Sequence, residues 1–126
     1  MILISQHQTE GRMGMIDDVI PAHHDGPPLH YDPRFDDGFY LVEGDLVFRV
    51  DDEVLELTAG QVALAPRGIP HTFANRTDRD ARVVMFVTPG GFEQYFAEGA
   101  ANARPPDQET VVVGARLRDM LTAPFE

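Results

Sequence analysis

Short apolar or alternating segments recur along this chain, and residues that favour turns interrupt them about every eight to twelve residues. Such a spacing is typical of an antiparallel β-sandwich or β-barrel. Between two of the segments, Gly44 and Asp45 form a pair that is typical of a tight hairpin. The segments predicted as strands are 2–6, 13–20, 38–44, 46–52, 53–60, 61–66, 71–75 and 81–89.

The strand pattern ends at Pro89, and a helical pattern follows it. Phe92, Tyr95 and Phe96 are spaced i, i+3 and i+4, so they share one face of a helix. This spacing predicts a short helix over residues 90–100.

The C-terminal part of the chain allows two interpretations. Residues 101–109 contain two adjacent prolines and are predicted to be a linker. A closing helix is predicted over 110–122, and an extra strand at 110–113 is the alternative, because that stretch is rich in β-branched residues. With 126 residues we expect a single domain, with a barrel over about 1–89 and a helical segment over about 90–126.

Composition excludes several classes of protein. The net charge is −11 and only 10 residues are Lys or Arg, which argues against binding to nucleic acid or to an anionic membrane surface. The absence of cysteine excludes disulfides, thiolate zinc sites and cysteine nucleophiles. The N-terminal residues lack the pattern of a signal peptide, and no run of 18 apolar residues is present, so we expect a cytoplasmic protein.

Two polar stretches stand out against the strand pattern. The stretch "GPPLHYDPRFDDGFYLVEG", residues 26–44, places His30, Asp32 and an acidic pair ending in Asp37 before an apolar run. In "GQVALAPRGIPHTFAN", residues 60–75, glycines and prolines form a stiff turn just before His71. A side chain held beside such a turn loses little entropy when it binds a ligand or a metal ion.

The second of these stretches resembles a known family motif. Five of its residues have the spacing of the second cupin motif, G(X)5PXG(X)2H(X)3N, and they are Gly60, Pro66, Gly68, His71 and Asn75. Residues 30–44 resemble the first cupin motif, HXH(X)4E(X)6G, with two substitutions. The chain is similar to the small single-domain cupins that are often called quercetin-dioxygenase-like. The resemblance implies an all-β fold, the cupin double-stranded β-helix or jelly-roll barrel, with short C-terminal helices.

The resemblance also implies a metal site. Cupins commonly bind a divalent ion through three histidines and one glutamate, which here correspond to His30, Asp32, Asp37 and His71. Aspartate therefore replaces the second histidine and the glutamate. Two neutral imidazoles, two carboxylates and a divalent cation give a neutral site, which favours Fe²⁺ or Mn²⁺ over copper and leaves Ni²⁺ and Zn²⁺ open.

The geometry expected of a strand supports part of this site. Residues i and i+2 of a strand share a face, so His30 and Asp32 are predicted to point into the barrel together. With His71 they form the two-histidine, one-carboxylate set of non-haem Fe(II) oxygenases. Asp37 is shorter than glutamate by one methylene, roughly 1.5 Å. It either binds the ion directly, binds it through water, or does not bind it.

Three functions remain open at this stage. The leading one is a metal-dependent oxygenase that acts on an enol or phenol bound in the barrel, with His30, Asp32 and His71 as the catalytic residues. The second is a metal-free isomerase or cyclase, in which Asp32 orients a histidine as general base. The third is a non-catalytic module that binds or senses a small molecule. We also expect a homodimer, because the apolar strand at 2–6 would leave an open edge in a monomer.

Other residues are assigned to simpler roles. His23 and His24 are predicted to be an exposed loop pair, although that loop could cover the mouth of the site, and Arg67 is predicted to be an exposed turn residue. The predicted core residues of the barrel are Phe39, Leu41, Phe48, Phe73 and Met85.

Overall fold

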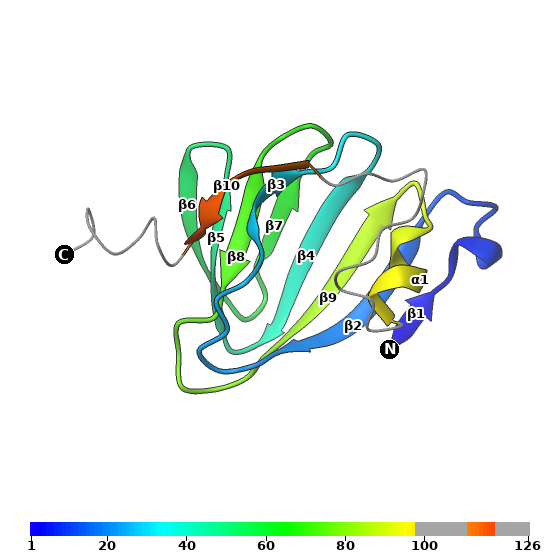
Figure 1. Cartoon of the computed structure of the whole chain (residues 1–126). Coiled ribbons are helices and arrows are strands. Elements are labelled where there is room, and N and C mark those ends of the chain that lie inside the picture. Colours follow the sequence, from blue (N-terminus) through cyan, green and yellow to red (C-terminus); the bar gives the residue numbers. More distant parts are fainter. Residues whose placement is uncertain (98–110, 118–126) are drawn as a thin grey trace.

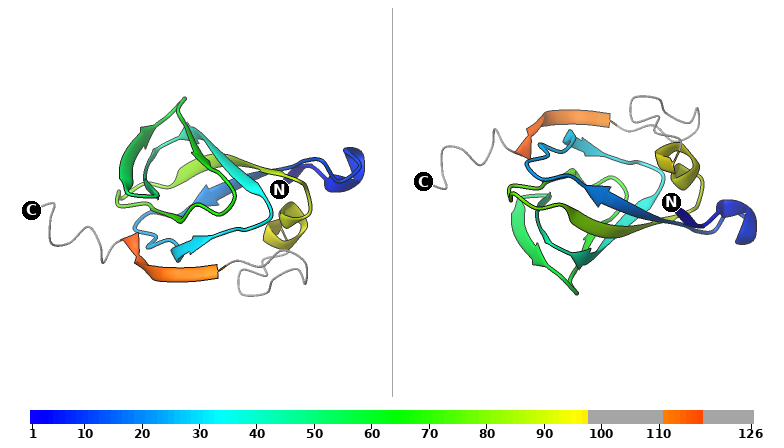
Figure 2. Two further views of the ribbon diagram at one scale, coloured as in Figure 1. Left: turned by 90° about the horizontal axis from the view of Figure 1, so that it is seen from above. Right: turned by 90° about the horizontal axis from the view of Figure 1, so that it is seen from below.

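The structure is a computed structural model that describes residues 1–97 and 111–117. The described part consists of two five-stranded antiparallel sheets that face each other (Figures 1 and 2). The first sheet has the order β1 (Ile2–Ile4), β2 (Gly14–Ile20), β9 (Ala81–Thr88), β4 (Asp36–Glu43), β7 (Val62–Ala65). The second has the order β10 (Val111–Arg116), β3 (Pro28–Tyr31), β8 (His71–Ala74), β5 (Asp45–Val50), β6 (Glu53–Thr58). From β2 onward nearly every connection crosses between the sheets, so the predicted all-β jelly-roll barrel is confirmed.

The core lies between the two sheets and follows the alternation of the strands. In β9, every second residue from Ala81 to Val87 is buried and the residues between them are half-buried or exposed. The five predicted core residues are all buried. Three of them, Phe39, Phe48 and Phe73, form an aromatic cluster with ring centroids 5.0 to 5.9 Å apart. Burying one such side chain stabilises the fold by roughly 1.5–3 kcal/mol.

The hairpin predicted at Gly44 and Asp45 is wrong. The strand before this pair, β4, hydrogen-bonds to β7 and β9, whereas the strand after it, β5, hydrogen-bonds to β6 and β8. Gly44 has a φ of +91° and lies against the backbone of Ala81. It therefore allows the chain to cross from the first sheet to the second at a point of close packing. The tight hairpin lies instead at Asp51 and Asp52, between β5 and β6.

The helix predicted over 110–122 is also wrong over residues 111–116. Residues 111–116 form β10, which pairs with β3 and so extends the second sheet. The alternative of a strand is therefore confirmed, and it is longer than the predicted 110–113. Its β-branched residues fit a strand better than a helix. The predicted linker 101–109 lies outside the described residues.

The other end segments agree with prediction in part. The strand predicted over 2–6 ends at Ile4, because Ser5 caps a 3₁₀ helix, η1 (Gln6–Gln8). The helix predicted over 90–100 is present as α1 (Phe92–Ala97). Strand β1 pairs only with β2 in the described part of the chain, so its other edge is open and the homodimer remains a prediction.

Glu93, in the first turn of α1, connects this helix to the barrel through hydrogen bonds. Its buried carboxylate accepts hydrogen bonds from the backbone N–H groups of Gln6 and Gly91, at 2.7 and 2.6 Å. Phe92 stacks on the buried ring of Phe35, with centroids 5.0 Å apart. None of the helices in the described part of the chain is long and apolar enough to cross a membrane.

Gly26 offers a test of the close packing between the 23–28 loop and β8. A Cβ at Gly26, where φ is +73°, would lie 1.6 Å from the carbonyl oxygen of Phe73, whereas a Cβ at Gly11, where φ is +78°, would have no atom of the described residues within 4 Å. We expect Gly11→Ala to lower the free energy of unfolding by about 1 kcal/mol, the cost of a left-handed residue with a Cβ. Gly26→Ala should lower it by more than about 3 kcal/mol, because the 23–28 loop must also move away from β8.

Thermal unfolding of the two variants measures this difference. The melting temperature should fall by about 4 °C in the first variant and by more than about 10 °C in the second. Equal melting temperatures would show that the loop before β3 does not pack on β8 as described.

Candidate metal centre

Two histidines lie side by side at one end of the barrel. His30 is near the end of β3 and His71 begins β8, and the two residues are register partners across these strands. Their ring centroids are 4.4 Å apart. His71 is 2% exposed, whereas His30 is half-buried and therefore forms the accessible side of the pair.

Backbone carbonyls orient both rings in the same way. Nδ1 of His30 lies 2.8 Å from the carbonyl oxygen of Pro28, and Nδ1 of His71 lies 3.0 Å from that of Ile69. A carbonyl oxygen only accepts hydrogen bonds, so each Nδ1 carries the proton and donates it. The neutral rings therefore present Nε2 as a lone pair, which is the arrangement usual for histidines that bind a metal ion.

Two buried carboxylates face these histidines. Asp37 points inward from β4 in the first sheet, and Asp32 lies in the connection that crosses from β3 to β4. They are 4% and 2% exposed. From Nε2 of His71, the distance is 3.4 Å to Oδ2 of Asp32 and 3.6 Å to Oδ2 of Asp37. The site is thus built from both sheets and from the segment between them.

These distances are too long for direct hydrogen bonds and are close to the spacing of two ligands that share an ion. Both exceed the usual 2.7–3.2 Å of an N–H···O bond. Two neighbouring ligands bound at about 2.1 Å from one ion lie roughly 3.0 Å apart in an octahedral site and 3.4 Å apart in a tetrahedral one. His30, Asp32 and His71 each offer a ligand atom, and these three atoms all lie within 4.8 Å of one another.

The electrostatics of Asp37 also favour a cation. Burial is the main cause that raises its pKa to about 7, the neighbouring carboxylate of Asp32 raises it further, and His71 opposes both. Its Oδ1 is a buried oxygen that lacks a hydrogen-bond partner among the described residues. Burial also disfavours charge on His71, but Asp37, the carbonyl of Ile69 and Asp32 outweigh it and raise the pKa of His71. A cation between these groups would satisfy both carboxylates, so the residues fit a divalent metal ion.

The structure brings together the four residues named from the sequence. Asp32 lies one residue beyond the end of β3 and not on the strand itself, but its side chain reaches the same point. His23 and His24 are exposed, as predicted, and do not cover the mouth of the site. Their loop is bound near Asn75, past the end of β8 that is opposite to His71.

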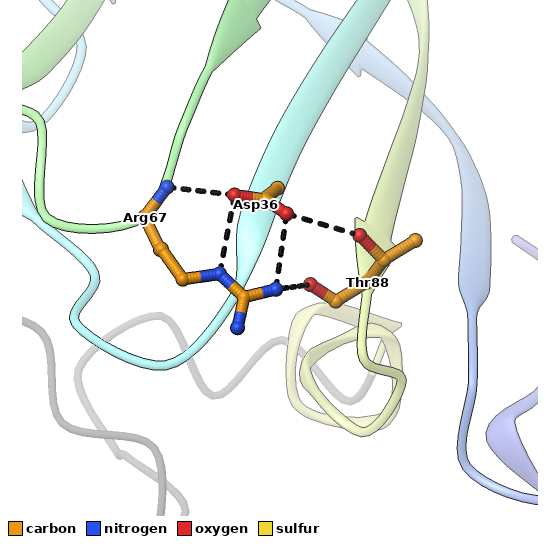
Figure 3. A network of polar contacts seen from close by, with 3 residues as sticks. All are labelled: Asp36, Arg67 and Thr88. Atoms are coloured by element: carbon orange, nitrogen blue, oxygen red, sulfur yellow. Dashed lines mark hydrogen bonds and ion pairs between the residues drawn. The ribbon is translucent and has the colours of Figure 1, made fainter.

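Sequence reasoning missed a group of residues just outside the site. Arg67 is half-exposed, but it is more than a turn residue, because its guanidinium and backbone N–H both bind the carboxylate of Asp36 (Figure 3). Arg67 also donates to the carbonyl of Thr88. The adjacent residues Asp36 and Asp37 were the signal in the sequence that could have indicated this ion pair. Neighbouring residues of a strand point to opposite faces, so Asp36 needs a partner on the outer face when Asp37 points inward.

The inner side of the centre is closed by the aromatic cluster. Phe39 lies next to His71, with ring centroids 6.4 Å apart. Two surface hollows of about 380 and 420 Å³ lie elsewhere, beside Leu57 and Asn75 respectively, and none of the four site residues lines either of them. His30 is half-buried and is therefore the most exposed of the four site residues.

Curated proteins with similar sequences match about half of the chain. The tetracenomycin polyketide synthase protein TcmJ of Streptomyces glaucescens is 40% identical over 60 residues, which are 48% of this chain and 40% of TcmJ. The polyketide synthase protein CurC of Streptomyces cyaneus is 37% identical over 60 residues, 48% of this chain and 39% of CurC. The matched segment therefore spans about two fifths of these relatives.

Solved structures share the fold. KdgF from a Halomonas species superposes with a TM-score of 0.65 at 17% identity, over 75% of this chain and 80% of KdgF. A sugar phosphate isomerase of the cupin superfamily from Silicibacter pomeroyi superposes with a TM-score of 0.55 at 28% identity, over 61% of this chain and 50% of that protein. The sequence profile of the family described as "Cupin domain" matches residues 18–87, which include the site and most of both sheets. The resemblance first seen in two short motifs is thus a true relationship, and this chain belongs to the cupin family.

Proposed function

We propose that this chain is a metal-dependent cupin enzyme that acts on an enol or phenol of the polyketide type, with an oxygenase as the leading reaction. One observation carries the proposal. Ligand atoms of His30, Asp32 and His71 lie within 4.8 Å of one another, beside a buried oxygen of Asp37 that lacks a partner among the described residues. Two histidines and a carboxylate are the ligand set that non-haem Fe(II) oxygenases use.

The substrate class comes from the relatives and from chemistry. TcmJ and CurC are both named as polyketide synthase proteins, and each matches 60 residues of this chain, at 40% and 37% identity. Polyketide chains carry 1,3-dicarbonyl groups that enolise and ring-close to phenols. Such oxygens bind hard divalent ions well, so the substrate and the proposed centre are compatible.

Each residue of the centre has a distinct task in this proposal. A divalent ion, when bound, supplies Lewis acidity that stabilises the enolate or phenolate oxygen of the substrate. Asp32 and Asp37 balance the charge of the ion. His71 fixes the centre on the buried side, next to Phe39, which keeps water away from it. His30, the half-buried member, lies where the substrate enters.

A metal-free reaction is the second candidate. Burial raises the pKa of Asp37 to about 7, so this group exchanges protons near neutral pH. Despite the burial of His71, the neighbouring Asp37, the carbonyl of Ile69 and Asp32 raise the pKa of His71 above its usual value. Groups with such pKa values serve as general acids and bases in isomerisation and cyclisation. The similarity to a cupin named as a sugar phosphate isomerase agrees with this candidate.

A metal titration tests the centre. We expect the wild-type protein to bind one equivalent of Mn²⁺ or Fe²⁺ under anaerobic conditions, as measured by calorimetry. Asp32→Asn keeps the shape of the side chain but removes its charge, and we expect it to weaken binding by at least about 100-fold, since even the loss of an outer-shell partner costs roughly 10–100-fold.

Asp78→Asn is the matched control for this experiment, because Asp78 is an exposed aspartate in the turn between β8 and β9. It should bind metal as the wild-type protein does. Equal affinity in all three proteins would locate the ion elsewhere, and no binding by the wild-type protein would contradict the proposed function.

Removal of metal separates the two candidate reactions. With a flavonol or a 1,3-diketone as the probe, we expect oxygen uptake to stop after dialysis against a strong chelator and to return when Fe²⁺ or Mn²⁺ is added. A metal-free isomerase or cyclase would instead keep its activity in the chelator and lose it in His71→Ala. An oxygen electrode and product analysis by mass spectrometry distinguish these results.

A further inference from the structure

A single turn, residues 66–69, holds the backbone around two of the candidate ligands. It is closed by a hydrogen bond of 3.1 Å from the N–H of Ile69 to the carbonyl of Pro66. The N–H of Gly68 donates to the carbonyl of Asp32 at 2.8 Å. The carbonyl of Ile69 accepts from Nδ1 of His71 at 3.0 Å. The position of the 66–69 turn therefore sets where Asp32 and His71 lie.

Arg67, at the tip of this turn, connects the turn to Asp36, the residue next to the candidate ligand Asp37. Its backbone N–H donates to Oδ1 of Asp36 at 2.8 Å, and its Nη2 donates to Oδ2 of Asp36 at 3.0 Å. Asp36 directly precedes Asp37 in β4. The same Nη2 donates to the carbonyl of Thr88 at 3.3 Å, at the end of β9 (Figure 3). These contacts of Arg67, Asp36 and Thr88 are called the Arg67 clamp below.

We propose that Arg67 is a positioning residue of the metal centre, which acts through the clamp to hold the 66–69 turn at a fixed distance from the start of β4. The inference rests on the proposed function, since it assumes that the centre binds an ion. The clamp joins the two parts of the chain that carry the opposing ligands. One part is the turn with Asp32 and His71, and the other is the strand with Asp37.

The physical reason is the narrow tolerance of metal coordination. Bond lengths at a metal ion vary by only about 0.2 Å, so a small shift of the turn relative to β4 disturbs the fit of all the ligands. Arg67 binds Asp36 with two nitrogens of its guanidinium, which fixes direction as well as distance. An ion pair that is half-exposed adds little to overall stability. We therefore expect the clamp to affect metal affinity more strongly than the unfolding temperature.

The chain contains a matched control pair. Arg82 in β9 binds Asp17 in β2 through Nε at 3.0 Å and Nη2 at 2.6 Å. The side chains of Arg67 and Arg82 are both 52% exposed. Both pairs cross between strands of the first sheet or their ends, but neither Arg82 nor Asp17 adjoins a candidate ligand in the sequence. The Arg82–Asp17 pair thus reports the effect of losing a bidentate ion pair without an effect on the centre.

The experiment is a double-mutant cycle with Mn²⁺ affinity as its readout. We expect Arg67→Gln and Asp36→Ala each to weaken Mn²⁺ binding by about 10–100-fold, the range seen when a group that supports a metal ligand is lost. The double variant should bind Mn²⁺ with about the same affinity as the single variant that binds it more weakly, because the two residues act as one unit. Arg82→Gln and Asp17→Ala should stay within about twofold of the wild-type affinity, and all variants should melt within a few degrees of the wild-type protein.

A second measurement does not need metal. In the metal-free protein, the imidazole NMR signals of His71 should broaden or split in Arg67→Gln and remain sharp in Arg82→Gln, because only the first variant frees the turn that orients the ring. If the wild-type protein binds no Mn²⁺, the proposed function fails, and the NMR signals still decide whether the clamp positions His71.

Three results of the Mn²⁺ experiment would overturn the inference while leaving the metal centre intact. The clamp variants could bind Mn²⁺ as tightly as the wild-type protein, the Arg82 and Asp17 variants could lose affinity to the same extent, or the effects of Arg67→Gln and Asp36→Ala could add independently. Unchanged His71 signals in Arg67→Gln would overturn it by the second measurement.

Discussion

The repulsion between two buried carboxylates is the constraint on which the rest of this site depends. Asp32 and Asp37 are almost fully enclosed, and the charge of the first contributes to the raised pKa of the second. Buried charges persist in proteins only where they are paired or coordinate a metal ion. The fold supplies His71 as one partner, and His71 lies within 3.6 Å of both carboxylates. One imidazolium cannot neutralise two carboxylates, so either a proton or a metal cation completes the charge balance. The two candidate reactions follow from these two solutions.

The jelly-roll topology is what makes such a site possible. His30 and His71 are neighbours in one sheet, whereas Asp37 comes from the other sheet and Asp32 from the crossing between them. At one end of the barrel the strands of both sheets begin or end, so side chains from four segments meet there. The aromatic cluster of Phe39, Phe48 and Phe73 packs against the inner side of the site and makes that side apolar. Low polarity on that side strengthens the electrostatic interactions within the site.

Much of this arrangement could be predicted from the sequence, because the signals were local. Strand periodicity and turn residues gave the all-β class, and the fixed gaps between Gly60 and Asn75 gave the family and His71. The errors arose where distant contacts decide the structure. Gly44 and Asp45 have the composition of a hairpin, yet the partners of the flanking strands lie in different sheets. The sequence of 110–122 permits a helix, but residues 111–116 pair with the edge of β3 and form a strand. Arg67 is an exposed turn residue, as predicted, but nothing in the sequence shows that Asp36 lies beside it.

The replacement of glutamate by aspartate at position 37 has a structural answer. Strand β4 begins at Asp36, two residues earlier than the pattern predicted, so Asp37 lies within the ladder between Ala65 and Val87. This register directs its carboxylate inward, and Oδ2 reaches 3.6 Å from Nε2 of His71 in spite of the shorter side chain. Asp36 faces outward at the same point and is held by Arg67. A centre with two carboxylates would be neutral once it held a divalent ion, so it would select substrates less by their overall charge than by a hydroxyl that ionises on binding. An enol or a phenol is such a group.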